Sequence, residues 1–292
     1  MNNILVIGSA NIDRCYSVEN IVSPKETVSC SGYSENLGGK GFNQAVAAAK
    51  AGGRVFAYYK TNPADSAVFS VALKDAGAKA VFFESEKPTG HAVIQIDKDG
   101  QNSIIVYGGA NTDFTSEDAD AALEAFGEGD FLILQNEINR IPEILENAKA
   151  KGLTTVFNPS PFTDDILKMP LVNVDYFIVN ELEAALLCGE ESIRKIPLAF
   201  LKKFPGSKLV LTLGEQGSQF YSQDYVARVN AFPAEAVDTT GAGDCYLGYF
   251  TAGICDGMEI REAMLRASKA SAICVGRAGA AISVPGREEV EV

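Results

Sequence analysis

The sequence predicts an α/β protein in which helices flank a doubly wound, mostly parallel sheet, with a small separate β-sheet attached. Three observations lead to this prediction. The chain opens on a short apolar run, Ile4–Ile7, that ends at Gly8 as a buried parallel strand does. After residue 130, strand-like and helix-like segments alternate, which is typical of a parallel sheet. Before that point lie two patches of short, strand-like segments.

The first helix follows a glycine-rich turn. Residues Gly39, Lys40 and Gly41 lead into the alanine-rich segment Asn43–Ala51, and the pair that follows, Gly52–Gly53, is a helix stop signal. We therefore expect a helix that begins directly after this turn.

The two strand-rich patches predict the smaller sheet. They contain four strand-like runs: Cys15–Val18, Thr27–Cys30, His91–Ile96 and Asn102–Tyr107. The last two runs predict a hairpin, because an Asp-Gly turn joins them. No flexible linker or internal repeat divides the chain, so we expect these strands, at about residues 11–35 and 88–108, to be inserted into one domain spanning residues 1–292.

The remaining elements form the parallel sheet and its helices. We predict strands at Phe131–Leu134, Thr154–Phe157, Tyr176–Val179 and Lys208–Thr212, and a short final strand at Ile282–Val284. We predict helices near Ile141–Ala150, Leu182–Leu187, Gly243–Cys255 and Ile260–Val275. In such sheets the functional loops follow the carboxyl ends of the strands.

Composition excludes several classes of function. The formal charge of −13 argues against a nucleic-acid partner, since duplex binding depends on Lys and Arg that neutralise phosphates. The first residues lack the basic region of a signal peptide, and the first apolar run is too short to cross a membrane. We therefore expect a cytoplasmic protein with no membrane partner.

The cysteines and the single histidine argue against further classes of function. Six cysteines are scattered without a C-x-x-C pair, so structural zinc and disulfides are not expected. Catalysis by Ser-His or Cys-His pairs would depend on His91, the only histidine, which lies in a strand-like run with no nucleophile motif nearby.

A glycine-rich turn beside an acid carries the main chemical signal. Asp238 begins a segment that runs through Gly241, Ala242 and Gly243 to Asp244 and then continues as a helix. Small residues at a helix start let backbone N–H groups approach an anion, and the helix dipole adds positive potential. A carboxylate there can accept a proton from an attacking hydroxyl. The alternative is a plain tight turn followed by a first-turn acid.

The glycine-rich turn before the first helix is neither of two well-known nucleotide motifs. The segment Asn36–Ala49 lacks the G-x-x-x-x-G-K-[ST] pattern of a Walker loop, and Gly8–Asn11 lacks the G-x-G-x-x-G fingerprint of dinucleotide-binding folds. A hydride-transfer function is therefore disfavoured.

With both glycine-rich segments considered, the chain resembles the ribokinase-like family of carbohydrate kinases. Residues 39–53 and 238–250 are similar to the family's two signature regions. Shorter likenesses extend along nearly the whole chain, at Gly8–Asp13, Thr89–Ala92, Gly109–Asn111, Asn180–Glu183 and Thr212–Gly214. The resemblance implies a β-sheet lid over the substrate and ATP-dependent phosphorylation of the primary hydroxyl of a sugar, ribose or a close relative.

The resemblance also implies which residues bind the sugar, and the details are most similar to the ribokinase branch. The matching residues are Asn11, Asp13, Gly39, Lys40, Asn43, Ala92, Ile94, Glu137 and Asp244. Carboxylates and amides suit a polyol because they give or take paired hydrogen bonds. Asp244 would be the catalytic base, and the backbone of Gly241, Ala242 and Gly243 would hold the developing charge. Each polar residue has a plainer alternative as a turn cap, helix cap or solvated acid.

Nucleotide and metal sites follow from the same resemblance. The residues implied for ATP are Asn180, Glu183, Thr212, Gly214, Gly217, Gly243 and Ser268, with Glu183 serving Mg²⁺ through water. A monovalent cation, K⁺, is implied beside Asp238, Thr240, Cys274, Arg277, Gly279 and Ser283. The alternative for this last group is an ordinary turn between a helix and a strand.

Departures from the family pattern leave the substrate open. Phe42 and Ile12 stand where smaller residues are common, and Lys60–Asp65 replaces a G-D-D-like turn; we expect these changes to touch the edge of the sugar pocket. A family kinase acting on fructose, deoxyribose, adenosine or pseudouridine is therefore a second candidate. A non-catalytic regulator is disfavoured because the anion-binding segment and Asp244 are both intact. The resemblance also implies a homodimer formed through the lid, which would cover exposed strand edges.

Overall fold

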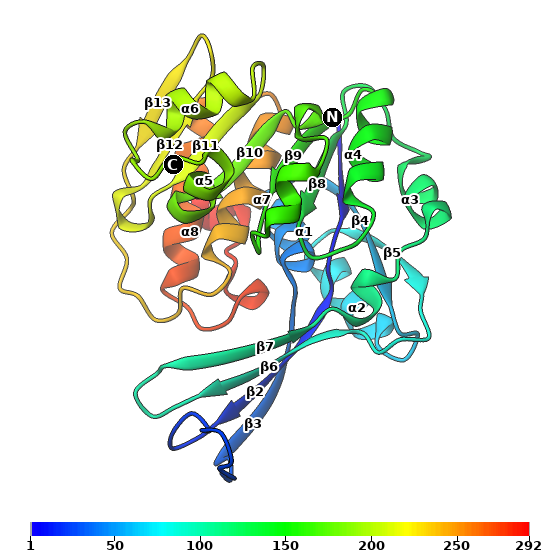
Figure 1. Cartoon of the computed structure of the whole chain (residues 1–292), viewed down its shortest axis with the longest axis vertical. Coiled ribbons are helices and arrows are strands. Elements are labelled where there is room, and N and C mark those ends of the chain that lie inside the picture. Colours follow the sequence, from blue (N-terminus) through cyan, green and yellow to red (C-terminus); the bar gives the residue numbers. More distant parts are fainter. Residues whose placement is uncertain (1, 292) are drawn as a thin grey trace.

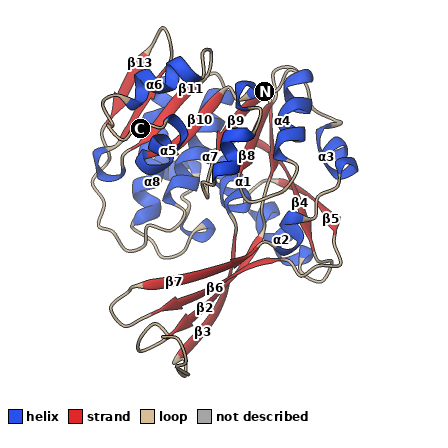
Figure 2. Cartoon of the chain, viewed as in Figure 1, coloured by secondary structure: helices blue, strands red, loops and turns tan. Residues whose placement is uncertain are grey.

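The computed structural model describes residues 2–291, and within them the chain forms two sheets (Figures 1 and 2). The larger sheet has nine strands. From one edge to the other they are β13 (Val226–Val229), β12 (Ser218–Tyr221), β11 (Lys208–Thr212), β10 (Tyr176–Asn180), β9 (Thr154–Asn158), β8 (Phe131–Gln135), β1 (Asn3–Ile7), β4 (Arg54–Thr61) and β5 (Lys79–Glu84). Only β12 and β13 run antiparallel to their neighbours, so the predicted doubly wound, mostly parallel sheet is confirmed.

Helices cover both faces of this sheet. Within the described residues they are α1 (Lys40–Lys50), α2 (Ser66–Asp75), α3 (Ser116–Leu123), α4 (Ile141–Ala150), α5 (Glu181–Cys188), α6 (Ile196–Lys203), α7 (Ala242–Cys255), α8 (Ile260–Val275) and α9 (Arg287–Val290). Strand β1 shows why two layers are needed. Its alternate residues Ile4 and Val6 pack with α1, α7 and α8, whereas Leu5 and Ile7 pack with α3 to α6 on the other face.

The smaller sheet projects from one end of the body (Figure 1). Its strands, in spatial order, are β3 (Gly32–Gly38), β2 (Asn11–Ser17), β6 (Gly90–Ile96) and β7 (Asn102–Tyr107). They come from the two segments that the sequence marks as insertions. The strand-like run Thr27–Cys30 is not a strand, and pairing with β2 begins only at Gly32. We call these four strands the lid sheet.

A second predicted strand is also wrong. Residues Ile282–Val284 were expected to form a strand, but Ala281–Ser283 is a short 3₁₀ helix. Ser283 donates from both its backbone N–H and its hydroxyl to the Ala280 carbonyl, and this local turn takes the place of strand pairing. No helix within residues 2–291 has the length and apolar character that crossing a membrane requires.

Candidate active site

The candidate site lies at the carboxyl edge of the large sheet. Ser9 follows β1, Glu137 follows β8, Asn158 ends β9, Asn180 ends β10 and Thr212 ends β11. Because these strands are parallel, all five residues come to one edge. The order of strands reverses at β1, which is where ligands bind in open α/β sheets.

Asp244 occupies the first turn of α7 and is 8% exposed. Two consecutive residues of α1 donate to its carboxylate. Asn43 Nδ2 lies 3.1 Å from Oδ2, and Gln44 Nε2 lies 2.8 Å from Oδ1. Each carboxylate oxygen therefore has one fixed donor and keeps a lone pair, which suits an acceptor for a proton from a bound hydroxyl.

The glycine-rich turn before Asp244 forms the start of α7. Gly241 has a left-handed conformation with φ of 76°, and a Cβ there would lie 2.9 Å from the Ala280 Cβ, so only glycine fits. A Cβ at Gly243 would meet nothing within 4 Å, which leaves open space over the first turn. The first turn of a helix has N–H groups without intrahelical partners. An anion fits this space, as the sequence predicts.

Two further carboxylates, Glu137 and Asp13, interact with each other, and Glu137 also interacts with Asp244. Glu137 accepts from the Ser9 hydroxyl and from the Lys40 backbone N–H at 3.0 Å, so it closes the N-terminus of α1. Burial raises the pKa of Glu137, and Asp244 adds to this effect. Burial, with the charge of Glu137, also raises the pKa of Asp13 to about 6. Together these carboxylates form a cluster of acceptors.

Lys40 lines a cavity that Asp244 and Glu183 also line. The charge of Asp244, opposed by burial and supported by Glu137 and Glu183, raises the pKa of Lys40. Its side chain therefore faces carboxylates of both halves of the site and stays protonated.

Two asparagines offer amide groups to the same space. Asn11 is buried, and its Oδ1 accepts from Asn111 Nδ2 at 2.7 Å. The other amide atom of Asn111 accepts from the Ala10 backbone N–H at 3.1 Å, which fixes the pair. Asn43 Oδ1 is buried and accepts no hydrogen bond from any described residue. A buried acceptor without a donor is costly, so this atom calls for a donor that the described residues do not supply.

Ala92 and Ile94 lie on β6 directly opposite Asp13 and Cys15 of β2. Opposite residues on paired strands share a face, so both apolar side chains lie on the face of the lid sheet that carries Asp13. Ala92 is buried and Ile94 is half-buried. Gly39, also expected at the sugar, has φ of 93° and packs against the Ser9 carbonyl, where a Cβ would clash.

The sequence departs from the family pattern at Phe42 and Ile12, and both were expected to touch the edge of the sugar pocket. For these two large residues that expectation is wrong. Phe42 is 1% exposed and packs edge-to-face on Phe69 of α2, in the body's core. Ile12 alternates with Asp13 along β2, faces the opposite side of the lid sheet and packs against the same core. Lys60, from the altered turn, is buried and pairs with Asp118.

A cavity of about 240 Å³ lies beside the glycine-rich turn, where the sequence predicts the nucleotide. Lys40, Asn180, Glu183, Thr212, Gly243 and Asp244 are among its lining residues. Asn180 and Glu183 also form a capping box at α5, in which Asn180 accepts from the Glu183 N–H at 2.8 Å. Asn180 and Glu183 therefore both cap α5 and line the cavity. Thr212 donates to the Val179 carbonyl at 3.2 Å.

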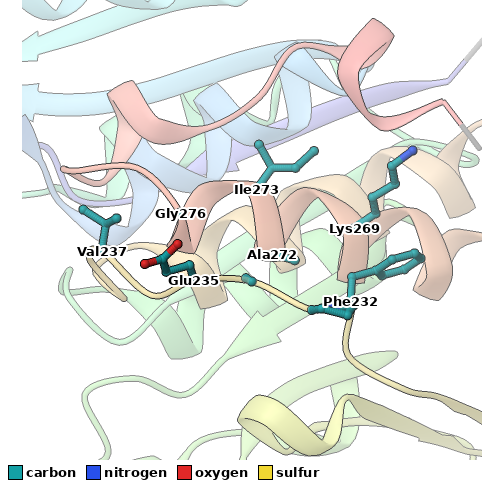
Figure 3. A pocket seen from close by; sticks show the side chains of 9 residues that line it. Phe232, Glu235, Val237, Lys269, Ala272, Ile273 and Gly276 are labelled. Carbon is teal, nitrogen blue, oxygen red and sulfur yellow. The ribbon is translucent and has the colours of Figure 1, made fainter.

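Three of the residues expected at ATP do not line this cavity: Gly214, Gly217 and Ser268. Gly214 is exposed just beyond β11, and Gly217 makes a tight turn in which a Cβ would lie 2.1 Å from the Val229 carbonyl oxygen. Ser268 is buried on α8. Its neighbour Lys269 lines a separate groove of about 410 Å³ between α8 and the segment 232–237 (Figure 3).

The expected cation residues lie on two segments, 238–240 and 274–283, which meet and together form the loop region behind the anion turn. Asp238 accepts from the N–H groups of Thr240 and Gly279, each at 2.9 Å, which ties the two segments together. Burial raises the pKa of Asp238, but these hydrogen bonds outweigh it and the net pKa is lowered. Within this loop the Ser283 hydroxyl lies 2.8 Å from the Cys274 thiol.

Arg277 belongs to that loop only through its backbone. Its N–H donates to the Cys274 carbonyl at 3.0 Å, and its guanidinium pairs with Glu289. The guanidinium charge is thereby paired with the Glu289 carboxylate.

Comparison with known proteins decides the family. The model of the pfkB family carbohydrate kinases matches residues 1–287. The chain belongs to the pfkB family of carbohydrate kinases. It is therefore a phosphotransferase whose acceptor is an alcohol group, and the family expected from the sequence is confirmed.

Several pfkB relatives are similar over the full chain. A ribokinase of Staphylococcus aureus (strain COL) is 34% identical, covering 99% of this chain and 98% of its own. A bifunctional ribokinase/ribose-5-phosphate isomerase A of Fructilactobacillus sanfranciscensis is 38% identical, and the match covers 99% of this chain but only 56% of that protein. The structure of Arabidopsis thaliana ribokinase complexed with ribose and ATP is 29% identical, with a TM-score of 0.86 over 99% of this chain and 98% of that one.

Sequence reasoning missed several residues of this pfkB site. Gln44 contacts Asp244, Gln135 contacts Gln44, Asn111 fixes Asn11, and Ser9 holds Glu137. Asn158 lines the nucleotide cavity. Polar residues directly after buried strands were the available signal for Ser9, Gln135 and Asn158.

Proposed function

We propose that this carbohydrate kinase transfers the γ-phosphoryl group of ATP to the primary hydroxyl of ribose, O5. The observation that carries the proposal is Asp244, held by two amides between a cluster of polyol acceptors and donors and the nucleotide cavity. The ribokinases among the relatives support ribose. The side chains of Phe42 and Ile12 point away from the acceptor cluster, so they give no reason for a different sugar.

In this mechanism the sugar lies against Asn11, Asp13, Asn43 and Glu137, under the apolar cover of Ala92 and Ile94. Asp244 accepts the proton of O5 as the oxygen attacks the γ-phosphorus. N–H groups of Gly241, Ala242 and Gly243 stabilise the charge that develops on the transferred group, and the Ala242 N–H turns to it from the Thr239 carbonyl, 3.3 Å away. Lys40, which is protonated between Asp244 and Glu183, adds positive charge where sugar and phosphates meet. Alignment of the reactants supplies much of the acceleration.

The donor set of the cavity fits Mg²⁺. No group of three or more His, Cys, Asp and Glu side chains in residues 2–291 is arranged for a metal, and Glu183 is the carboxylate in the cavity wall besides Asp244. Mg²⁺ keeps several waters and binds through few carboxylates and substrate phosphates, as such a site requires. Glu183 would hold it through water, and the ion would neutralise phosphate charge.

A monovalent cation, K⁺, fits the loop behind the anion turn. The supporting observation is Asp238, whose two oxygens accept from the N–H groups of Thr240 and Gly279 and so join the two segments, while Arg277 pairs its charge with Glu289. Backbone oxygens of Asp238, Thr240, Cys274, Arg277, Gly279 and Ser283 would hold the ion. A cation there would steady the anion turn that starts α7.

A homodimer through the lid sheet belongs to the same proposal. Strand β7 exposes Ile104, Ile105 and Val106 by 52, 66 and 60%, on both faces of the lid sheet. Covering this surface with a second lid would remove an exposed apolar edge strand. A monomeric mass by light scattering at assay concentration would contradict it. The cytoplasmic location stays a prediction.

The deciding experiment is a coupled ADP-release assay over ribose, deoxyribose, fructose, adenosine and pseudouridine, with and without K⁺. We expect the largest kcat/KM with ribose and a higher rate with K⁺. A higher kcat/KM for any other acceptor would replace ribose as the substrate. ADP release at background with all five would contradict the proposed reaction.

A further inference from the structure

Three buried side chains form a hydrogen-bonded chain that ends on Asp244. Gln135, at the carboxyl end of β8, donates from Nε2 to Gln44 Oε1 at 2.7 Å. Gln44, on α1, donates from Nε2 to Asp244 Oδ1 at 2.8 Å. Both glutamines are 0% exposed and neither lines the nucleotide cavity. Long polar side chains are seldom buried so completely, and these two need a reason.

Asp244, at the end of this series of side chains, fixes the direction of both hydrogen bonds. An ionised carboxylate only accepts, so Gln44 must present its NH₂ group to Asp244 and its oxygen to Gln135. Gln135 must then present its own NH₂ group to Gln44. Its remaining oxygen, Oε1, is left buried without a hydrogen bond from any described residue. The fold thus leaves one acceptor unsatisfied in order to deliver donors to Asp244.

Glycines make room for this chain. A Cβ at Gly8 would lie 2.3 Å from Gln135 Oε1, and one at Gly248 would lie 2.8 Å from the Gln44 carbonyl oxygen. Gly248 is one turn after Asp244 on α7, so its missing side chain lets α1 and α7 approach closely. That approach brings the side chain of Gln44 within reach of the carboxylate.

We propose that Gln44, oriented by Gln135, is a positioning residue that fixes the plane of the Asp244 carboxylate. The inference rests on the proposed role of Asp244 as base. Asn43 holds Oδ2 and Gln44 holds Oδ1, so the carboxylate cannot turn about its Cβ–Cγ bond without losing one donor. Asn43 belongs to the proposed sugar site, whereas both amide atoms of Gln44 are engaged, Nε2 by Asp244 and Oε1 by Gln135. Gln44 therefore acts on the base and not on sugar binding.

The test uses Gln44→Met and Gln135→Met, which keep side-chain length and remove the amide. We expect Gln44→Met to lower kcat about 10- to 100-fold, part of the roughly 10²–10⁴-fold that a positioned base supplies. KM and the calorimetric Kd for the sugar should stay within about threefold, because transition-state alignment alone is lost. Gln135→Met, which does not touch Asp244, should lower kcat about 5-fold through the freed Gln44 amide.

The double variant separates a relay from two independent effects. If Gln135 acts only through Gln44, Gln44→Met with Gln135→Met should be no slower than Gln44→Met alone. Thr251→Val is the matched control, since Thr251 is a buried residue of α7 with an unbonded hydroxyl, away from Asp244. It should keep parental kcat. If Gln44→Met does not fold, Gln135→Met still carries the test.

Two results would overturn the inference. One is a kcat within about twofold of the parent in both single variants; the other is a sugar Kd that weakens in step with kcat, which would make Gln44 a sugar ligand. Asp244→Asn distinguishes this failure from failure of the proposed function. If Asp244→Asn loses turnover but Gln44→Met does not, only the positioning role of Gln44 is contradicted. If Asp244→Asn has normal turnover, the proposed role of Asp244 as the base is contradicted.

Discussion

Strand β1 of the body and strand β7 of the lid sheet are both rich in apolar residues, but they place them differently. Ile4 to Ile7 of β1 are fully buried between two helical layers, whereas Ile104 to Val106 of β7 are more than half exposed. The body can therefore hold Asp244 and its donors in one geometry, because dense packing resists displacement. Within residues 2–291 no second layer covers Ile104 to Val106 of the lid sheet.

The largest expected effect is a loss of kcat, and it tests whether the packed body positions Asp244 as a base. Asp244→Asn keeps the size and hydrogen bonding of the side chain but removes the base, so kcat should fall by about 10²–10⁴-fold. Sugar affinity, measured by calorimetry, should stay within a few-fold, because the other sugar-side residues are unchanged. A kcat near the parental value would show that the packed body does not position a base.

Truncating an apolar side chain should lower the free energy of unfolding much more in the body than in the lid sheet. Phe42→Ala should lower the free energy of unfolding by about 3–5 kcal/mol, because the ring is buried against Phe69. Ile105→Ala, on the lid sheet, should change it by about 0.5 kcal/mol or less in a monomer. Urea unfolding measures both values. A large loss in Ile105→Ala that depends on protein concentration would show that the exposed face is covered by a second chain.

A substitution in the anion turn should have a smaller, local effect. Gly241→Ala strains a residue at φ of 76° and presses on Ala280, so we expect kcat/KM for ATP to fall about tenfold. Gly206→Ala is the control, because φ there is 97° but a Cβ would meet nothing within 4 Å. Both should lose about 1 kcal/mol of stability from backbone strain, Gly241→Ala should lose more through its contact with Ala280, and only Gly241→Ala should lose activity. Equal activity in the two variants would count against the turn as an anion site.

The smallest expected effect is a pH dependence where the lid sheet meets the body. The pKa of Asp13 is raised to about 6, so the carboxyl takes up a proton as the pH falls through 6 and loses acceptor capacity. Sugar affinity should weaken a few-fold between pH 7.5 and 5, and Asp13→Asn should flatten that part of the profile. A parental profile in the variant would assign the dependence elsewhere.

The raised pKa of Asp13 changes folding stability with pH in the opposite direction from sugar affinity. The folded protein binds this proton more tightly than the unfolded chain, in which the ordinary value is 3.8. The contribution of Asp13 to stability is therefore full below pH 3.8 and is lost as the pH rises from there through 6. Asp13→Asn should remove this pH-dependent loss in urea unfolding.

Much of the fold could be predicted because its signals are local. Helices α4 and α8 have the predicted bounds, and the hairpin of β6 and β7 turns where Asp99 and Gly100 lie. The final strand was wrong because an apolar run such as Ile282–Val284 does not say whether a neighbouring strand is available to pair with it. Phe42 was misplaced because adjacent helix residues point about 100° apart, and only packing decides which one faces a pocket.

The sequence by itself determined the α/β architecture, the two glycine-rich turns and the acid beside the second turn, because strand periodicity, helix caps and turn glycines act over a few residues. Only the tertiary structure decided that Asn43 and Gln44 both hold Asp244 and that Gln135 completes the chain. These residues are far apart in the sequence, and their contacts exist because glycines let β1, α1 and α7 pack closely. Such contacts depend on how the elements pack together, which no local pattern records.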